Sequence, residues 1–128
     1  MTLTATTVKL ALAGSLLVGA GTAPTVTVTA PGHSPKINVH WNYTVKVTVG
    51  GKPAAAKITE QIVDPLGTAH PVEFGKSTKN ITNWPFKGTF ADFIIWPASS
   101  RGIPLTLRII VVAGGVKKTV NYPVTPQG

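Results

Sequence analysis

The side chains that could carry out acid–base chemistry are few and widely spaced. The chain has four acidic residues, three histidines and no cysteine. Glu60 and Asp64 are four residues apart, but two acids beside a turn are typical of a solvated strand edge, and no serine occurs in a G-x-S-x-G turn. Without cysteine, neither a disulfide nor a thiolate metal site can form. We therefore predict a protein that is not an enzyme and holds no cofactor or metal ion.

Aromatic and basic side chains are stronger candidates for contact with a ligand. Trp-Pro-Phe at 84–86 and Trp-Pro at 96–97 lie where strands are expected to begin or end, so an exposed ring there could stack on a sugar or a side chain. The alternative is that these tryptophans close the ends of a core. A Ser-Ser-Arg-Gly loop and an adjacent lysine pair complete the set. The candidate contact residues are Trp84, Phe86, Trp96, Arg101, Lys117 and Lys118.

The charge balance favours anionic partners. Twelve Lys and Arg residues against four Asp and Glu residues give a net charge of +8. The basic residues are mostly single and no nucleic-acid-binding motif accompanies them, so we expect no specific nucleic-acid partner. The predicted partner is an anionic cell-envelope polymer, a polysaccharide or another protein. We expect the contact to be made by a basic face led by Lys46, Arg108, Lys117 and Lys118.

Two strands near the C-terminus specify their own pairing. If Gly114-Gly115 is a two-residue turn, Leu107 lies opposite Tyr122 and Ile109 lies opposite Val120, all on one side. A shift of one residue would expose this apolar set to water, so the register is strongly determined. This predicts an antiparallel hairpin with one buried side.

The preceding chain reads as further short strands. Residues 25–30 alternate, and 37–49 alternate with Ile37, Val39 and every second residue after them inward. The strand at 56–63 is interrupted by Glu60, which we expect either to reach solvent at an edge or to mark a bulge. A short strand is expected at 72–74, followed by a long irregular connection at 75–87. A longer strand is expected at 90–96, with residues 93–95 buried on both faces of the sheet. Asp64-Pro65-Leu66-Gly67 suits a type I turn.

The first residues predict a cleaved export signal. Lys9 precedes an apolar run at 10–20 that is too short for a comfortable membrane span and ends in small residues. We expect residues 1–20 to be removed, which leaves a secreted or cell-envelope protein without a transmembrane anchor and a single domain at 24–126.

These patterns together resemble bacterial immunoglobulin-like or fibronectin type III-like modules of secreted proteins. The strand at 41–49, the turns at 50–53 and 64–67, and the closing hairpin carry the resemblance. It implies an all-β, antiparallel immunoglobulin-like β-sandwich of about seven strands, in a noncatalytic binding or structural role. One alternative is a carbohydrate-binding accessory module that uses Trp84, Trp96 and Tyr122. A further alternative is a secreted protein inhibitor that presents loop 84–86 or 99–102.

Overall fold

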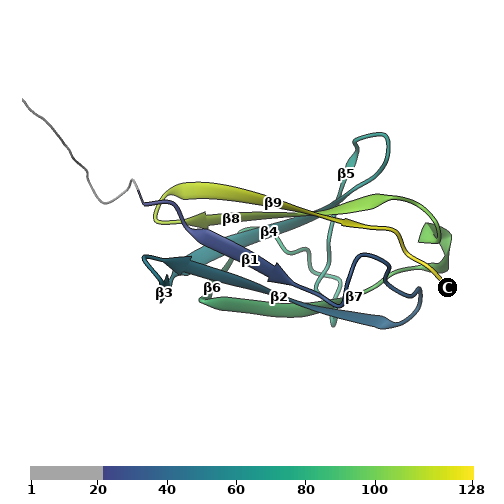
Figure 1. The fold of residues 1–128 in the computed structure, drawn as a ribbon, viewed down its shortest axis with the longest axis horizontal. Coiled ribbons are helices and arrows are strands. Elements are labelled where there is room, and N and C mark those ends of the chain that lie inside the picture. Colours follow the sequence, from purple (N-terminus) through teal and green to yellow (C-terminus); the bar gives the residue numbers. More distant parts are fainter. Residues whose placement is uncertain (1–21) are drawn as a thin grey trace, which may run out of the picture.

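The computed structural model describes residues 22–128 as two antiparallel sheets packed face to face (Figure 1). The expected leader at 1–20 lies outside the described residues. The first sheet consists of β1 (Thr25–Thr29), β2 (His40–Val49), β3 (Lys52–Pro53) and β7 (Thr89–Ile95). Strand β2 pairs with each of the other three. In the second sheet the order is β5-β4-β8-β9, and β6 also pairs with β4; its strands are β4 (Ala55–Val63), β5 (Ala69–Pro71), β6 (Trp84–Lys87), β8 (Leu105–Ala113) and β9 (Val116–Val124). The predicted antiparallel β-sandwich is confirmed.

Strands β8 and β9 form the predicted hairpin in the predicted register. Leu107 pairs with Tyr122 and Ile109 pairs with Val120. Both glycines of the turn at 114–115 have positive φ, 57° and 76°, as a type I′ turn requires. Leu107 and Ile109 are fully buried, so the apolar side of the hairpin faces the first sheet.

Strand β2 begins three residues later than predicted. Asn38 has a left-handed backbone with φ 60°, and its N–H donates to the carbonyl of Trp96 at 2.8 Å. This breaks the alternation, so Val39 is 50% exposed instead of inward. From Trp41 onward the expected pattern holds, and the buried residues of β2 are Trp41, Tyr43, Val45 and Val47.

Glu60 lies in the core, which corrects both sequence expectations for it. Strand β4 is central in its sheet and continues without a bulge, with Ala56, Ile58 and Glu60 on its inner side. Glu60 is 1% exposed. A carboxyl group at this depth requires a hydrogen-bond partner, and the first sheet supplies one, as described below.

The region expected to be one long connection contains a strand. The short strand predicted at 72–74 is instead β5, three residues earlier, and β6 occupies 84–87. From β6 the chain passes directly into β7 of the other sheet through Gly88, whose φ is 77°. A Cβ atom on Gly88 would lie 3.1 Å from Cβ of Pro53, so both the backbone angle and the space favour glycine. The sandwich thus has a continuous backbone link along one side.

The end of β7 is less buried than the sequence suggests. Its outer side faces solvent, and Ile95 is 47% exposed, so burial on both faces was a wrong expectation. The chain then turns inward at Trp96, which is 2% exposed. A turn of 3₁₀ helix, η2 (Ala98–Ser100), connects to β8.

The core changes character along its length. One part, the aliphatic end, consists of Val45, Val47, Ile58 and Val111. The other part, the aromatic end, consists of Trp41, Tyr43, Glu60 and Trp96. No helix in residues 22–128 is long and apolar enough to cross a membrane.

Candidate binding surfaces and a buried carboxyl group

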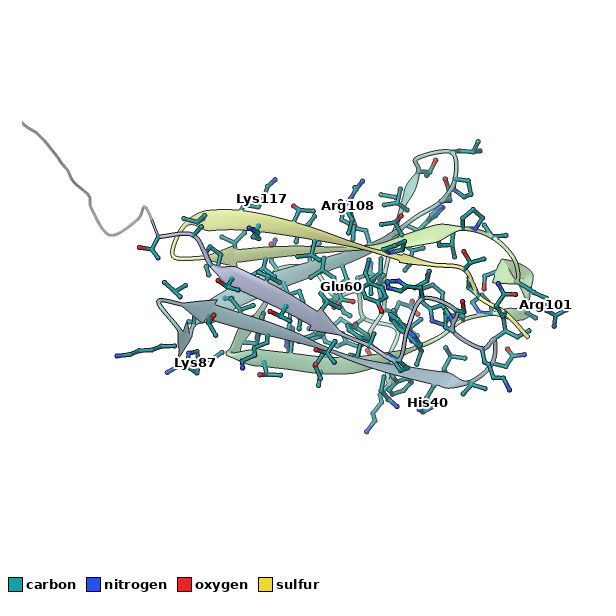
Figure 2. All side chains as sticks on the ribbon, in the orientation of Figure 1. His40, Glu60, Lys87, Arg101, Arg108 and Lys117 are labelled. Carbon is teal, nitrogen blue, oxygen red and sulfur yellow. The ribbon has the colours of Figure 1, made fainter. Side chains whose placement is uncertain are left out.

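Glu60 and Tyr43 join the two sheets through a buried hydrogen bond. The Tyr43 hydroxyl donates to Oε1 of Glu60 at 2.5 Å. The second carboxyl oxygen, Oε2, is buried and has no hydrogen-bond partner in the structure. Figure 2 shows Glu60 in the middle of the sandwich, between the two layers. This pair is the central polar contact of the aromatic end.

The environment of this pair favours the protonated form of both groups. Burial raises the pKa of Glu60 to about 7, although the hydrogen bond from Tyr43 acts in the opposite direction. Burial and the neighbouring Glu60 carboxyl also raise the pKa of Tyr43 above its ordinary value, so its hydroxyl keeps its proton and donates. Because Glu60 is 1% exposed, a substrate cannot reach it in this conformation.

The other acids are engaged or isolated. Asp92, on β7, accepts the backbone N–H of Gly75 with both carboxylate oxygens, at 3.2 and 3.1 Å. Asp64 accepts from His70 Nε2 at 2.8 Å, and the hydrogen bonds from His70 and from the backbone N–H of Thr68 lower the pKa of Asp64. Only Glu73 among the four acids is exposed.

The basic residues have no acidic partners within residues 22–128. All lysines and arginines except Lys9 lie in this part of the chain. The one ion pair in residues 22–128 joins His70 to Asp64, so no lysine or arginine of this part of the chain forms an ion pair. The surface therefore carries an unneutralised positive charge.

Four of these cations share the outer side of the second sheet. Lys57 and Lys117 both pair with Val112 of the strand between them, Arg108 pairs with Gln61, and Lys87 pairs with Ala55. The alternation of each strand places these side chains outward, because Ala56, Ile58 and Val111 face inward. We call this surface the basic face; its cations are Lys57, Lys87, Arg108 and Lys117.

The basic face differs from the one predicted. Lys118 pairs with inward-facing Val111, so it lies on the opposite side of β9 from Lys117. Lys46 is on β2, in the other sheet. Of the four residues expected to lead the basic face, the structure brings together only Arg108 and Lys117 (Figure 2).

The first sheet has a shallow groove on its outer side. It has a volume of about 730 Å³ and is open to solvent. Its lining includes Thr29, Pro31, Asn42, Thr44, Lys76 and Phe93. One face of the Phe93 ring is stacked on His40, with centroids 4.0 Å apart. A Cβ on Gly75 would lie 2.8 Å from ring carbons of Phe93, so the loop at 75 also packs closely against this ring. The groove is therefore lined mainly by apolar atoms, with a few hydroxyl and amide groups and little open aromatic face.

The structure separates the aromatic candidates. Trp84 is 38% exposed and contacts Phe74 edge-on, with centroids 5.0 Å apart, while Lys79 Nζ lies 5.1 Å from its ring centroid. Phe86 is half-buried, and its ring centroid is 5.8 Å from that of Phe90. Trp84 is thus the one predicted tryptophan with substantial open surface.

Trp96 and Tyr122 do not provide the expected stacking platforms. Trp96 packs in the core against Trp41, with centroids 5.6 Å apart, so the prediction of a ligand contact at Trp96 was wrong. It is buried because the chain turns inward after β7. The half-buried Tyr122 ring is stacked on His33 at 4.3 Å. Arg101 is exposed after η2, at the far end of the molecule from Lys117 (Figure 2).

Sequence reasoning missed the Glu60–Tyr43 pair and two members of the basic face. A signal for the pair existed, because a tyrosine on the inner side of a strand usually needs a partner for its hydroxyl. Lys57 and Lys87 could not be grouped with Lys117 without knowing that β4 pairs with both β6 and β8. Within the described residues, no three His, Asp or Glu side chains gather where they could hold a metal ion.

Comparison with known proteins adds little to this description. No protein-family model matches the chain, and a search of curated proteins finds no match. Among solved structures, it is similar to the crystal structure of a DUF4466 family protein from Parabacteroides merdae, with 13% sequence identity and a TM-score of 0.43. The similarity covers 80% of this chain and 43% of that one, so the chain spans less than half the length of that protein.

Proposed function

We propose that this protein is a noncatalytic binding module of the immunoglobulin-like type that attaches to polyanions outside the cell or in its envelope. The observation that carries this proposal is the absence of any acidic partner for the lysines and arginines of residues 22–128. An ion pair must be broken before its cation can bind another anion, and here that cost does not arise. The predicted leader at 1–20 supports the proposed location.

The state of the acids strengthens the positive field. Glu60 is buried and favours its neutral form below a pH of about 7, while Asp64 and Asp92 are occupied by His70 and by the Gly75 N–H. Asp64 and Asp92 keep their negative charges, but basic residues outnumber acidic ones twelve to four, so the surface that an anionic polymer meets remains strongly positive. Such a field accelerates association with anions and raises their local concentration.

A noncatalytic role is consistent with how the reactive groups are placed. The Glu60 carboxyl and the Tyr43 hydroxyl are sealed inside the core. His70 and Asp64 form the one histidine–acid pair of residues 22–128, and no hydroxyl group is hydrogen-bonded to either side chain. The arrangement therefore lacks the nucleophile–base contact that acyl-transfer sites use.

The proposal is tested by salt-dependent retention on an anionic matrix. We expect the full chain to bind a column of immobilised sulfated dextran at low salt and to elute as salt rises, because exposed charges are screened beyond about 8 Å at physiological ionic strength. The matched control is a column of uncharged dextran, which should not retain the protein. Absence of retention at low salt, or retention that persists at about 1 M salt, where the screening length is about 3 Å, would contradict the proposal.

A further inference from the structure

We propose that the basic face is the binding surface and that its ligand is a linear anionic polysaccharide lying across the strands. This inference rests on the proposed polyanion binding and adds to it a location and a ligand class. The four cations of the face lie on four adjacent strands of the second sheet. In order across the sheet, these are Lys87 on β6, Lys57 on β4, Arg108 on β8 and Lys117 on β9.

Three of these cations form a row that crosses the strands, with Lys87 offset along its strand from the other two. Lys57 and Lys117 are at the same level because both pair with Val112. With strands about 4.8 Å apart, their Cα atoms are separated by roughly 10 Å. Lys87, on the neighbouring strand β6, pairs with Ala55, which is two residues from Lys57 along β4. The Cα atoms of Lys87 and Lys57 are therefore roughly 8 Å apart. A linear polymer that crosses β6, β4, β8 and β9 would meet all three.

Arg108 provides a second point of contact farther along the face. It is four residues from Val112 on β8, about 13 Å away. Its Nη1 donates to Oε1 of Gln61 at 3.1 Å, which fixes the guanidinium beside β4. That bond uses one of its five N–H donors and leaves others for a carboxylate or sulfate group.

The groups between the cations favour a sugar polymer. The outward positions of β9 include Thr119 and Asn121, whose hydroxyl and amide groups can hydrogen-bond to sugar hydroxyls. No Asp or Glu occupies an outward position of β4, β6, β8 or β9. The face also lacks the exposed aromatic and leucine side chains by which surface-bound proteins enter a lipid interface; Val112, at 36% exposure, is its most open large apolar residue.

The test compares two triple variants with the same net charge. The first, Lys57→Gln/Lys87→Gln/Lys117→Gln, removes this row of three lysines. The matched control, Lys36→Gln/Lys46→Gln/Lys52→Gln, removes three exposed lysines that lie off the basic face. Binding of fluorescently labelled dextran sulfate is measured by anisotropy at low and moderate salt, with unfolding curves to confirm that both variants fold.

We expect the basic-face variant to bind dextran sulfate about tenfold more weakly than the unaltered chain and to show a shallower dependence of affinity on salt, since fewer counterions are released. The control should lose about threefold or less, from the change in net charge alone. Equal losses in the two variants would overturn the assignment of the face while leaving polyanion binding intact. No binding by the unaltered chain would instead overturn the proposed function.

The ligand class is tested with two further probes. Anionic phosphatidylglycerol vesicles and a DNA duplex are titrated under the same conditions as the dextran sulfate. Weaker binding of both, with the face variant affecting dextran sulfate most, is the expected result. Tighter binding of the vesicles or the duplex, lost in the basic-face variant, would show that the ligand is not a polysaccharide.

Discussion

The two ends of the core are equally buried but are held together by different forces. At the aliphatic end, Val45, Ile58 and Val111 have no exposed surface, and their side chains carry no polar group that needs a partner. Contacts there are non-directional and independent of pH. At the aromatic end, the Tyr43–Glu60 hydrogen bond has a fixed geometry and contains a group that titrates. The two ends are therefore similarly buried, but only the contribution of the aromatic end to stability depends on pH.

The largest effect is expected at the aliphatic end. Ile58→Ala should lower the free energy of unfolding by about 4 kcal/mol, because it removes buried methylene groups and leaves a cavity in a central strand. The change should be the same at pH 5 and pH 8, measured by urea denaturation. A loss that depends strongly on pH would mean that the two ends are not independent.

The aromatic end should make the protein less stable as pH rises. A glutamate in the unfolded chain has a pKa of about 4.3, whereas burial raises the pKa of Glu60 in the folded protein to about 7. Between these values the folded state keeps a proton that the unfolded state has lost, so stability falls with rising pH across this window and stays low above it. The total loss should be roughly 3–4 kcal/mol.

Glu60→Gln isolates this contribution. The amide still offers an oxygen to the Tyr43 hydroxyl but cannot ionise, so the decline between about pH 4 and pH 7 should be largely absent from its urea-unfolding profile. The variant should be the more stable protein at pH 8. If its profile runs parallel to that of the unaltered chain, Glu60 does not titrate in this range.

Tyr43→Phe should have a smaller effect at the same end. It removes the one donor to Glu60 and leaves Oε1, like Oε2, without a partner. We expect a loss of about 2 kcal/mol at pH 5, which is the cost of an unsatisfied buried acceptor. Because the Tyr43 hydrogen bond lowers the pKa of Glu60 in the folded protein, the decline in stability should extend to higher pH in the variant. An unchanged upper end of the decline would show that the hydroxyl does not act on the carboxyl group.

The smallest effect should come from salt, which acts on the surface and not on the core. Screening of the unpaired cations reduces their mutual repulsion, so about 0.5 M sodium chloride should raise stability by about 1 kcal/mol or less. The gain should be the same in Ile58→Ala and Tyr43→Phe, as measured in urea at constant pH. A different gain in Tyr43→Phe would mean that the aromatic end is open to ions.

Prediction from sequence succeeded where one side of a strand determined the answer. The hairpin register followed from Leu107, Ile109 and Tyr122, since only one pairing buries them together. The inward residues of β2 from Trp41 onward followed from the same rule. These local patterns were sufficient for the sheet class and for much of the core.

Prediction failed where a partner from another element decided the outcome. The polarity of a glutamate predicts an exposed position for Glu60. Its burial is explained by the Tyr43 hydroxyl, which reaches it from the opposite sheet. Val39 followed the alternation in sequence, but the left-handed turn at Asn38 exposed it. The basic face was misassigned because strand neighbours, not positions in the chain, decide which lysines meet. Such facts depend on topology, which a pattern along one strand does not contain.

The passage of the backbone through Gly88 gives the sandwich two unlike sides. Along the β6–β7 side, one uninterrupted stretch of chain belongs to both layers, and its peptide groups bond to Ala54 and Val47. Along the opposite side, β1 and β9 approach each other without a paired register among the described strands, and the backbone hydrogen bonds on that side join residues 33–37 to 125–127, beyond the ends of both strands. Separation of the layers should therefore begin between β1 and β9 at the end away from these bonds, with Gly88 as the pivot, so the first water to enter the interior would come from the side where the closing hairpin meets the first strand.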